Sequence, residues 1–355
     1  MFLLSLQPTL PCDWLVFSFG KIPALGREIR MGDMLLRPVP ASELEKLLAE
    51  LKKSLAAPQE GIFGPASISW KINRESALFL GAGRAALLQL AHPWVAAAIA
   101  QHSRTLDDPI GRFHHTFRVI FTMVFGPVDS AFAAARQLHR LHQTIAGALP
   151  AATGCFEQGS RYEANEISAL RWVYATLVDS AVVAYELMFP PLSDDERERY
   201  ICESLRMAAL FGISREHLPG TWAEFREYVD ATVESDTLGA SEATRGLARR
   251  LQSGAGLIVG PPFWYRAVTT ELLPVRLRAE FALAFGRREQ RSAARAMGWL
   301  RRFYLRMPAA VRFVGPYVEA QNRLRGRSSG LAVRLSNRVW VGQASLLSEG
   351  QGSSA

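Results

Sequence analysis

The histidines are the side chains best placed to do chemistry, and six of the seven lie between residues 92 and 142. The residues that share one helical stripe with His142 are apolar: Ala131, Ala135, Leu138, Ile145 and Leu149. Because an α-helix has 3.6 residues per turn, this apolar stripe predicts that His142 points into the core. The same spacing places His139 on a flanking, more polar row. A lone inward histidine can be a hydrogen-bonded core residue or a ligand, and the spacing leaves both open.

A second group of polar side chains opens the apolar stretch GRFHHTFRVIFTMVFG at residues 111–126. Arg112, His115 and Thr116 share one helical stripe with apolar residues further along, whereas His114 falls on another side. Burying a polar group without a partner costs about 2–7 kcal/mol, so this stripe should face a buried partner or a cavity. Together with His142 it suggests a polar-lined cofactor pocket between two helices, or a buried hydrogen-bond network with no ligand.

Several common catalytic motifs are absent. The chain has no H-E-x-x-H, P-loop or E-x-x-H sequence, which argues against zincins and di-iron bundles. GAGRAA at residues 81–86 imitates a dinucleotide-binding fingerprint. That fingerprint needs flanking strands, and the segment after it is Ala-rich and helical, so close helix packing is the expected role.

Charge and cysteine content narrow the functional class further. The net charge is +8, with arginine clusters at Arg249–Arg250, Arg287–Arg288 and Arg301–Arg302. Such patches can bind nucleic acid or anionic lipid, but solvated helix faces explain them too, and no nucleic-acid motif accompanies them. The three cysteines are far apart, with no CxxC and no disulfide framework, which favours a reducing compartment and hence the cytoplasm. No apolar run reaches the roughly 18 residues that span a bilayer.

The pattern of helix signals predicts a mainly α-helical, all-α protein with one globular domain over residues 61–326. Residues 1–60 are expected to be an N-terminal extension with one short amphipathic helix at 42–55, and residues 327–355 a flexible tail. Capping boxes are expected at Ser193 with Glu196 and at Thr221 with Glu224. Gly147 is expected to end the helix that carries His142.

The order of several segments resembles the rubber oxygenase and mycophenolic-acid-pathway oxygenase catalytic-domain family, which includes the latex clearing protein. The resemblance covers about residues 65–310. Its segments are GRAALLQLAHPWVAAAIAQHS, DPIGRFHHTFRVIFTMVFG, HRLHQTIAG, LRWVYATLVDS and ALFGISREHLP. It implies an all-α fold around a buried, non-covalent haem b whose iron is held by one histidine, which matches His142. It also implies an Arg, a Lys and a Thr on the other side of the haem, and Arg112, His115 and Thr116 match their spacing.

The chain departs from this family pattern at two positions. His115 stands where the latex clearing protein has a lysine able to ligate iron, so His115 could be a second ligand or a distal hydrogen-bond donor. Tyr174 stands where many relatives have histidine. His92 and His102 match signature positions and are expected to serve packing and hydrogen bonding.

The resemblance implies a haem b-dependent oxygenase or related oxidoreductase that uses dioxygen on an apolar small molecule, with isoprenoids among the candidate substrates. Arg112 and Thr116 would be its catalytic residues and His142 its iron ligand. Two alternatives stay open: a non-catalytic haem-binding or sensing protein, and a cofactor-free helical protein that binds an apolar ligand. We expect no nucleic-acid partner and no transmembrane segment, whereas peripheral membrane contact and the oligomeric state stay open.

Overall fold

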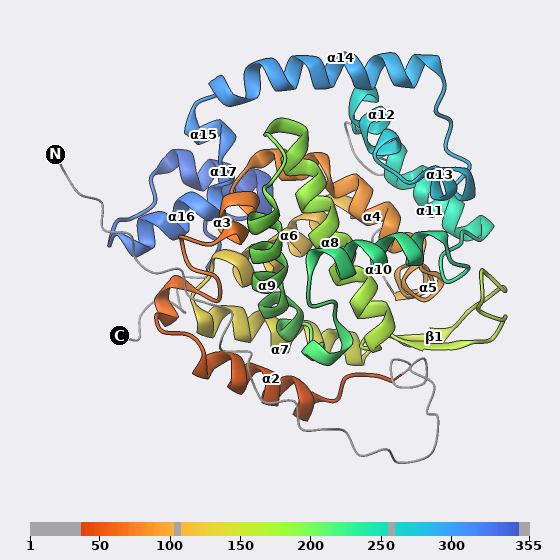
Figure 1. Cartoon of the computed structure of the whole chain (residues 1–355), viewed down its shortest axis with the longest axis horizontal. Coiled ribbons are helices and arrows are strands. Elements are labelled where there is room, and N and C mark those ends of the chain that lie inside the picture. Colours follow the sequence, from red (N-terminus) through yellow and green to blue (C-terminus); the bar gives the residue numbers. More distant parts are fainter. Residues whose placement is uncertain (1–36, 103–107, 255–259, 348–355) are drawn as a thin grey trace.

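The computed structural model describes residues 37–102, 108–254 and 260–347, and it is almost entirely helical (Figure 1). The α-helices are α2 (Ala41–Lys53), α3 (Ile68–Asn73), α4 (Ala82–Leu90), α5 (Pro93–His102), α6 (Pro109–Phe125), α7 (Val128–Gln143), α8 (Ile167–Met188), α9 (Asp194–Leu210), α10 (Trp222–Glu234), α11 (Glu242–Ser253), α12 (Phe263–Glu271), α13 (Val275–Glu280), α14 (Arg287–Phe303), α15 (Ala309–Arg312), α16 (Gly315–Leu324) and α17 (Leu331–Val341). Within the described ranges, four 3₁₀ helices join them: η2 (Pro58–Glu60), η3 (Ser76–Leu80), η5 (Arg215–His217) and η6 (Tyr304–Arg306). The strands β1 (Ala146–Ala148) and β2 (Arg161–Glu163) form one short antiparallel pair, with Gly147 opposite Tyr162. The expected all-α class is confirmed.

The central helix is α8, which packs against α3, α4, α9 and α14. It is apolar on most of its circumference, as expected for a helix covered on all sides. Among the described residues it is the one helix long and apolar enough to cross a membrane, but 72% of its most apolar window is buried in protein. Inside this fold, α8 is therefore the core helix.

One buried carboxylate ties α8 to two other helices. The side chain of Asp179 is 2% exposed and forms ion pairs with Arg84 of α4, at 2.6 Å, and with Arg226 of α10. Arg84 also donates to the Ser180 hydroxyl and to the Leu272 carbonyl. Because every charge in this network has a partner, the burial of an acidic side chain in the apolar helix α8 is tolerated.

The GAGRAA segment serves close packing, as expected. It forms the start of α4, where a Cβ at Gly81 would lie 2.5 Å from the Ser180 carbonyl oxygen and one at Gly83 would lie 2.6 Å from the Thr269 hydroxyl. Larger residues would push α4 away from α8 and α12. Among the residues that the structure describes, no strand flanks this segment, so the dinucleotide fingerprint lacks its context.

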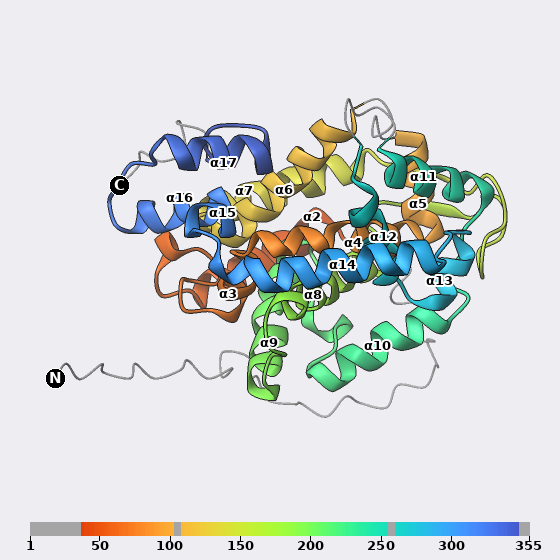
Figure 2. The same cartoon turned by 90° about the horizontal axis from the view of Figure 1, so that it is seen from above.

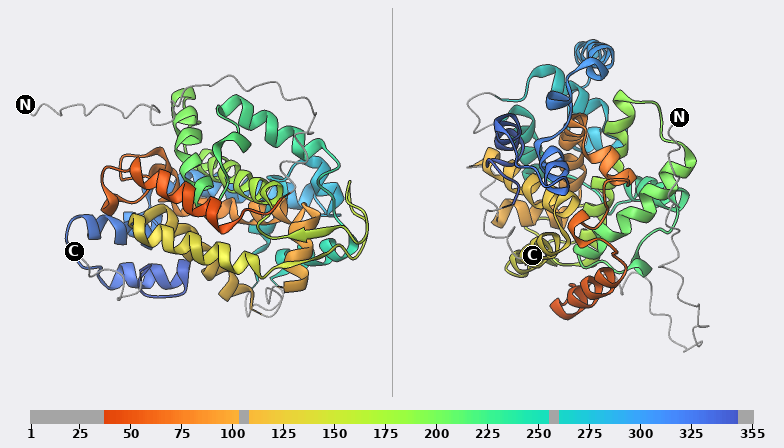
Figure 3. Two further views of the ribbon diagram at one scale, coloured as in Figure 1. Left: turned by 90° about the horizontal axis from the view of Figure 1, so that it is seen from below. Right: turned by 90° about the vertical axis from the view of Figure 1, so that its left-hand side faces the viewer.

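The predicted amphipathic helix near the N-terminus is α2, and it belongs to the core. Its residues Leu44, Leu48 and Leu51 are each at most 2% exposed. The helix packs against α9 and α7, and the view from below shows it beside α7 (Figure 3). Residues 1–36 of the predicted extension lie outside the described residues.

The predicted flexible tail after residue 326 is wrong for residues 331–341, which form the helix α17. Viewed from above, α17 and α16 lie at the end of the molecule opposite α13 (Figure 2), and α17 packs on α16 and α6. The Trp340 ring stacks on Phe79 with 3.8 Å between ring centroids, and Val341 is fully buried. The Gly and Ser residues of this region suggested flexibility, but the apolar face of α17 finds a partner in distant parts of the chain.

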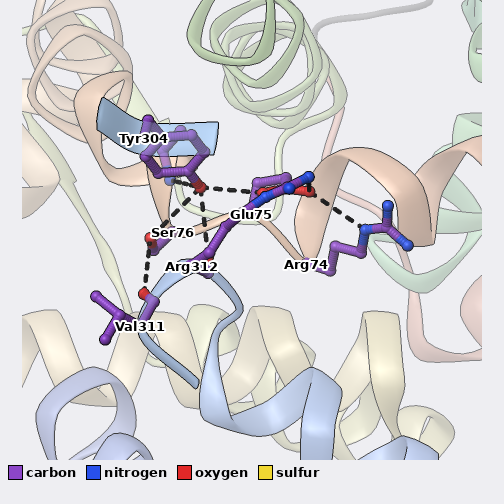
Figure 4. Close-up of polar contacts among 7 residues, drawn as sticks. Arg74, Glu75, Ser76, Tyr304, Val311 and Arg312 are labelled. Carbon is purple, nitrogen blue, oxygen red and sulfur yellow. Dashed lines mark hydrogen bonds and ion pairs between the residues drawn. The ribbon is translucent and has the colours of Figure 1, made fainter. Parts of the chain in front are cut away.

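A second buried carboxylate attaches the C-terminal segment to the rest of the fold. Glu75, which is 1% exposed, lies between the Tyr304 hydroxyl and the Arg312 guanidinium (Figure 4). Arg312 donates two hydrogen bonds of 2.8 Å to the carboxylate, and Tyr304 donates one of 3.0 Å. Burial raises the pKa of Tyr304 to about 12, so its hydroxyl keeps the proton that it donates.

Both expected capping boxes are confirmed, at the starts of α9 and α10. The expected role of Gly147 is wrong, because α7 already ends at Gln143 and Gly147 lies in β1. Cys202 is disulfide-bonded, which the wide spacing of the cysteines did not predict, whereas Cys155 is an exposed free thiol.

We predict that Asp179→Asn lowers the free energy of unfolding by about 3–5 kcal/mol, because it leaves the Arg84 guanidinium buried without a counter-charge. The matched control is Asp230→Asn. It removes the other carboxylate on Arg226, but its side chain is 65% exposed, so the expected cost is below about 1 kcal/mol. Urea unfolding followed by circular dichroism measures both. Equal costs in the two variants would contradict the role given to Asp179.

Candidate functional site

The helices α6 and α7 form a tight hairpin joined only by Gly126 and Pro127. Asp108 caps α6 by accepting a 2.8 Å hydrogen bond from the Gly111 amide. In such a hairpin, residues about equally far from the turn lie opposite each other. Arg112 in the first turn of α6 is therefore brought to His142 in the last turn of α7.

The electrostatics of His142 agree with this pairing. The residue is half-buried, and burial is the main cause that lowers the pKa of its imidazole to about 4. The Asn165 side chain works in the opposite direction, while the charges of His139 and Arg112 lower this pKa further. The imidazole is therefore neutral near pH 7, which is the form that binds a metal.

Asn165 supports His142 and was missed in the sequence. It is 3% exposed, and its side-chain NH2 donates a 3.0 Å hydrogen bond to the His139 carbonyl oxygen. This leaves the amide oxygen as the acceptor for the His142 ring, an arrangement typical of the groups that orient a ligating histidine. Asn165 lies between β2 and α8, so no helical period links it to His142, and only the tertiary fold reveals the contact.

The sequence predicted that His142 points into the core and that His139 lies on a more polar row of α7. For His139 this prediction is wrong. His139 is the more buried of the two, at 5% exposed, and its Nε2 lies 2.9 Å from the Val39 carbonyl oxygen. The prediction from the helical period holds only if a single side of α7 faces the core. In the fold α7 contacts α6, α2 and α9, so more than one of its faces is covered. His139 thus holds the segment before α2, whereas His142 bonds to the Asn165 side chain.

The polar stripe of α6 is less enclosed than expected. Arg112 and His115 are half-buried and Thr116 is exposed, whereas the last turns of α6 are fully buried. Burial lowers the pKa of Arg112, and burial together with Arg118 and Arg112 lowers the pKa of His115. Among the described residues, nothing closes over this end of α6 to form the enclosed pocket that the sequence suggested.

The tautomer of His115 follows from one hydrogen bond. An Arg118 guanidinium nitrogen lies 3.1 Å from His115 Nδ1, and because a guanidinium can only donate, Nδ1 accepts. The neutral ring then carries its hydrogen on Nε2. The i, i+3 spacing of these two residues could have revealed the pair in the sequence. His114 lies apart from the stripe, as predicted, with its Nε2 3.1 Å from the Val339 carbonyl oxygen of α17.

The other singled-out residues lie away from this group. Tyr174 is 2% exposed and shares a 2.6 Å hydrogen bond with the Ser204 hydroxyl, and burial raises its pKa. His92 is buried against Trp94 and Phe156. His102 lies 2.9 Å from the Ala146 carbonyl oxygen. These contacts are the packing and hydrogen bonding expected of His92 and His102.

The donor set brought together here contains one neutral imidazole, one guanidinium and one imidazole N–H, with no carboxylate. Within the described ranges, no three His, Cys, Asp or Glu side chains gather as a metal site. A single histidine suits an iron that arrives with its own equatorial ligands, as haem iron does. The residues present therefore fit the group that the sequence suggested.

Comparison with known proteins identifies a family for most of the chain. The family model described as "ER-bound oxygenase mpaB/B'/Rubber oxygenase, catalytic domain" matches residues 70–302, a range that includes α6, α7 and Asn165. No curated protein and no solved structure matches the chain. Since the matched range is well over half of the sequence, the chain belongs to the mpaB and rubber oxygenase catalytic-domain family.

Proposed function

We propose that this protein is a haem b-dependent oxygenase that acts on an apolar substrate, with isoprenoids among the candidates. The observation that carries the proposal is that Arg112 lies opposite a neutral His142 in the α6–α7 hairpin. The Asn165 side chain is the hydrogen-bond partner of His142. Family membership supports oxygenase chemistry. When bound, the haem would supply the iron that activates dioxygen.

In this proposal each side chain has a distinct task. His142 would hold the iron through one ring nitrogen while Asn165 fixes the orientation of the ring. Arg112, whose charge already acts on His142, would stabilise developing negative charge or move a proton. Thr116 would offer a hydroxyl on the same face of α6.

His115 would act as a hydrogen-bond donor. Because Arg118 occupies Nδ1, the neutral His115 ring has its hydrogen on Nε2 and no free lone pair there. Of the two roles that the sequence left open, the hydrogen bond favours the donor over the second iron ligand. The positive charges of Arg118 and Arg112 also lower the pKa of His115 and so disfavour a second hydrogen on this ring.

We predict that protein from haem-sufficient cells shows a Soret band and a pyridine haemochrome spectrum of haem b. His142→Ala should lose at least about 90% of this haem, because it removes the iron ligand. The matched control is His139→Ala on the same helix. It should keep its haem per folded molecule but lose about 1–3 kcal/mol of unfolding free energy, since the Val39 carbonyl loses its partner. Folded wild-type protein that shows no Soret band and takes up no added hemin would refute the haem proposal. Equal haem loss in both variants would refute the choice of His142.

We also predict that ferric wild-type protein and His115→Ala share one spin state in electron paramagnetic resonance. Neither should give the low-spin signal of two imidazole ligands, because Arg118 directs the hydrogen of His115 to Nε2. Arg118→Met serves as the comparison, since it frees Nδ1 and lets a low-spin fraction grow. A low-spin wild-type signal that turns high-spin in His115→Ala would show that His115 ligates the iron.

A further inference from the structure

The helix α14 carries an unusual distribution of charge. It lies along the top edge of the molecule in the view of Figure 1, with Ala293 and Met297 buried on one side. Exposed arginines gather on the opposite side: Arg287, Arg288, Arg291, Arg295 and Arg302. The one acidic side chain of this helix, Glu289, lies outside the arginine face and accepts from the Gly286 amide at the helix start.

These arginines lack counter-charges among the residues that the structure describes. Arg287, Arg291, Arg295 and Arg302 form no ion pair there, although many other arginines of the chain do, including Arg84, Arg136 and Arg312. Like charges at i, i+4 spacing destabilise a helix slightly, so the row carries a small cost. An external anion would remove this repulsion.

The arginines border a groove with an aromatic floor. This groove of about 860 Å³ lies between α14 and the start of α12 and is lined by arginines together with Phe263, Trp264 and Trp299. The Arg288 guanidinium lies over the Phe263 ring, 4.7 Å from its centroid, and is thereby held at the groove. A ligand that fits must combine an anionic group with apolar surface.

Exposed apolar side chains continue along the chain from this groove. Trp299 is 69% exposed, and Leu305 and Val311, which follow α14, are 51% and 59% exposed. Aromatic side chains could stack on nucleic-acid bases, but exposed aliphatic side chains find no partner in a phosphate backbone. An arginine row flanked by Trp and aliphatic residues is the composition of helices that lie at a lipid interface.

We propose that the α12–α14 groove binds the headgroups of anionic phospholipids and seats this edge of the molecule on a membrane surface. Arg287, Arg291 and Arg295 would contact the phosphates, and Trp299 would enter the interface beside them. The proposal does not depend on haem or on catalysis.

The test is flotation of the full-length protein with vesicles of phosphatidylcholine mixed with phosphatidylglycerol, and with vesicles of phosphatidylcholine alone. Binding should require phosphatidylglycerol and fall as salt is raised. The double variant Arg291→Glu, Arg295→Glu should bind about 30-fold or more weakly, since each arginine contributes about fivefold near an anionic surface. Trp299→Ala, a change at an exposed position, should also weaken binding.

The control is Arg199→Glu, Arg215→Glu, which makes the same charge change at two exposed arginines outside the groove lining. It should bind vesicles like the wild type. Equal loss in both double variants would overturn the proposal, because net charge alone would then explain binding. The lipid-binding proposal would also be overturned if folded wild-type protein failed to float with either vesicle. The same holds if the groove variants lost binding to duplex DNA but kept vesicle binding.

Discussion

The fold depends on the placement of one negative charge inside an apolar helix. Asp179 sits in α8, the helix that the rest of the molecule surrounds, and an unpaired carboxylate there would cost several kcal/mol. Two guanidiniums from α4 and α10 offset that cost, and each can reach Asp179 only if its helix docks in one position. The lack of a Cβ at Gly81 lets α4 come close enough to α8 for this. Packing and charge therefore specify the same helix arrangement.

The α6–α7 hairpin shows how sequence spacing becomes a site. The stripe of Arg112, His115 and Thr116 was visible in the sequence, and so was His142, but their relation to each other depends on the length of the turn between the helices. Because only Gly126 and Pro127 join the two helices, α7 runs back along α6 and its end lies beside the start of α6. The structure adds what periodicity does not contain. Asn165 comes from the loop before α8, and the hydrogen bond from Arg118 decides which nitrogen of His115 carries the hydrogen.

Local signals in the sequence predicted local structure well. The capping boxes at Ser193 and Thr221 and the amphipathic helix α2 need only a few neighbouring residues, and the structure has all three. Features that depend on distant partners were harder to predict. His139 is buried because α2 and α9 cover its side of α7, and α17 is ordered because Trp340 meets Phe79, more than two hundred residues earlier. The sequence pattern of a single helix does not state how many of its faces will be covered.

The Glu75 cluster has a consequence for what counts as the folding unit of this chain. Glu75 lies within the family match at residues 70–302, but Tyr304 and Arg312, which satisfy its carboxylate, lie beyond it. A fragment cut at the family boundary would keep the buried acid and its neighbour Arg74 but lose Tyr304 and Arg312. The segment that follows the matched range therefore acts as an internal counterion, because its Arg312 supplies the closest positive charge to an acid buried inside the family domain.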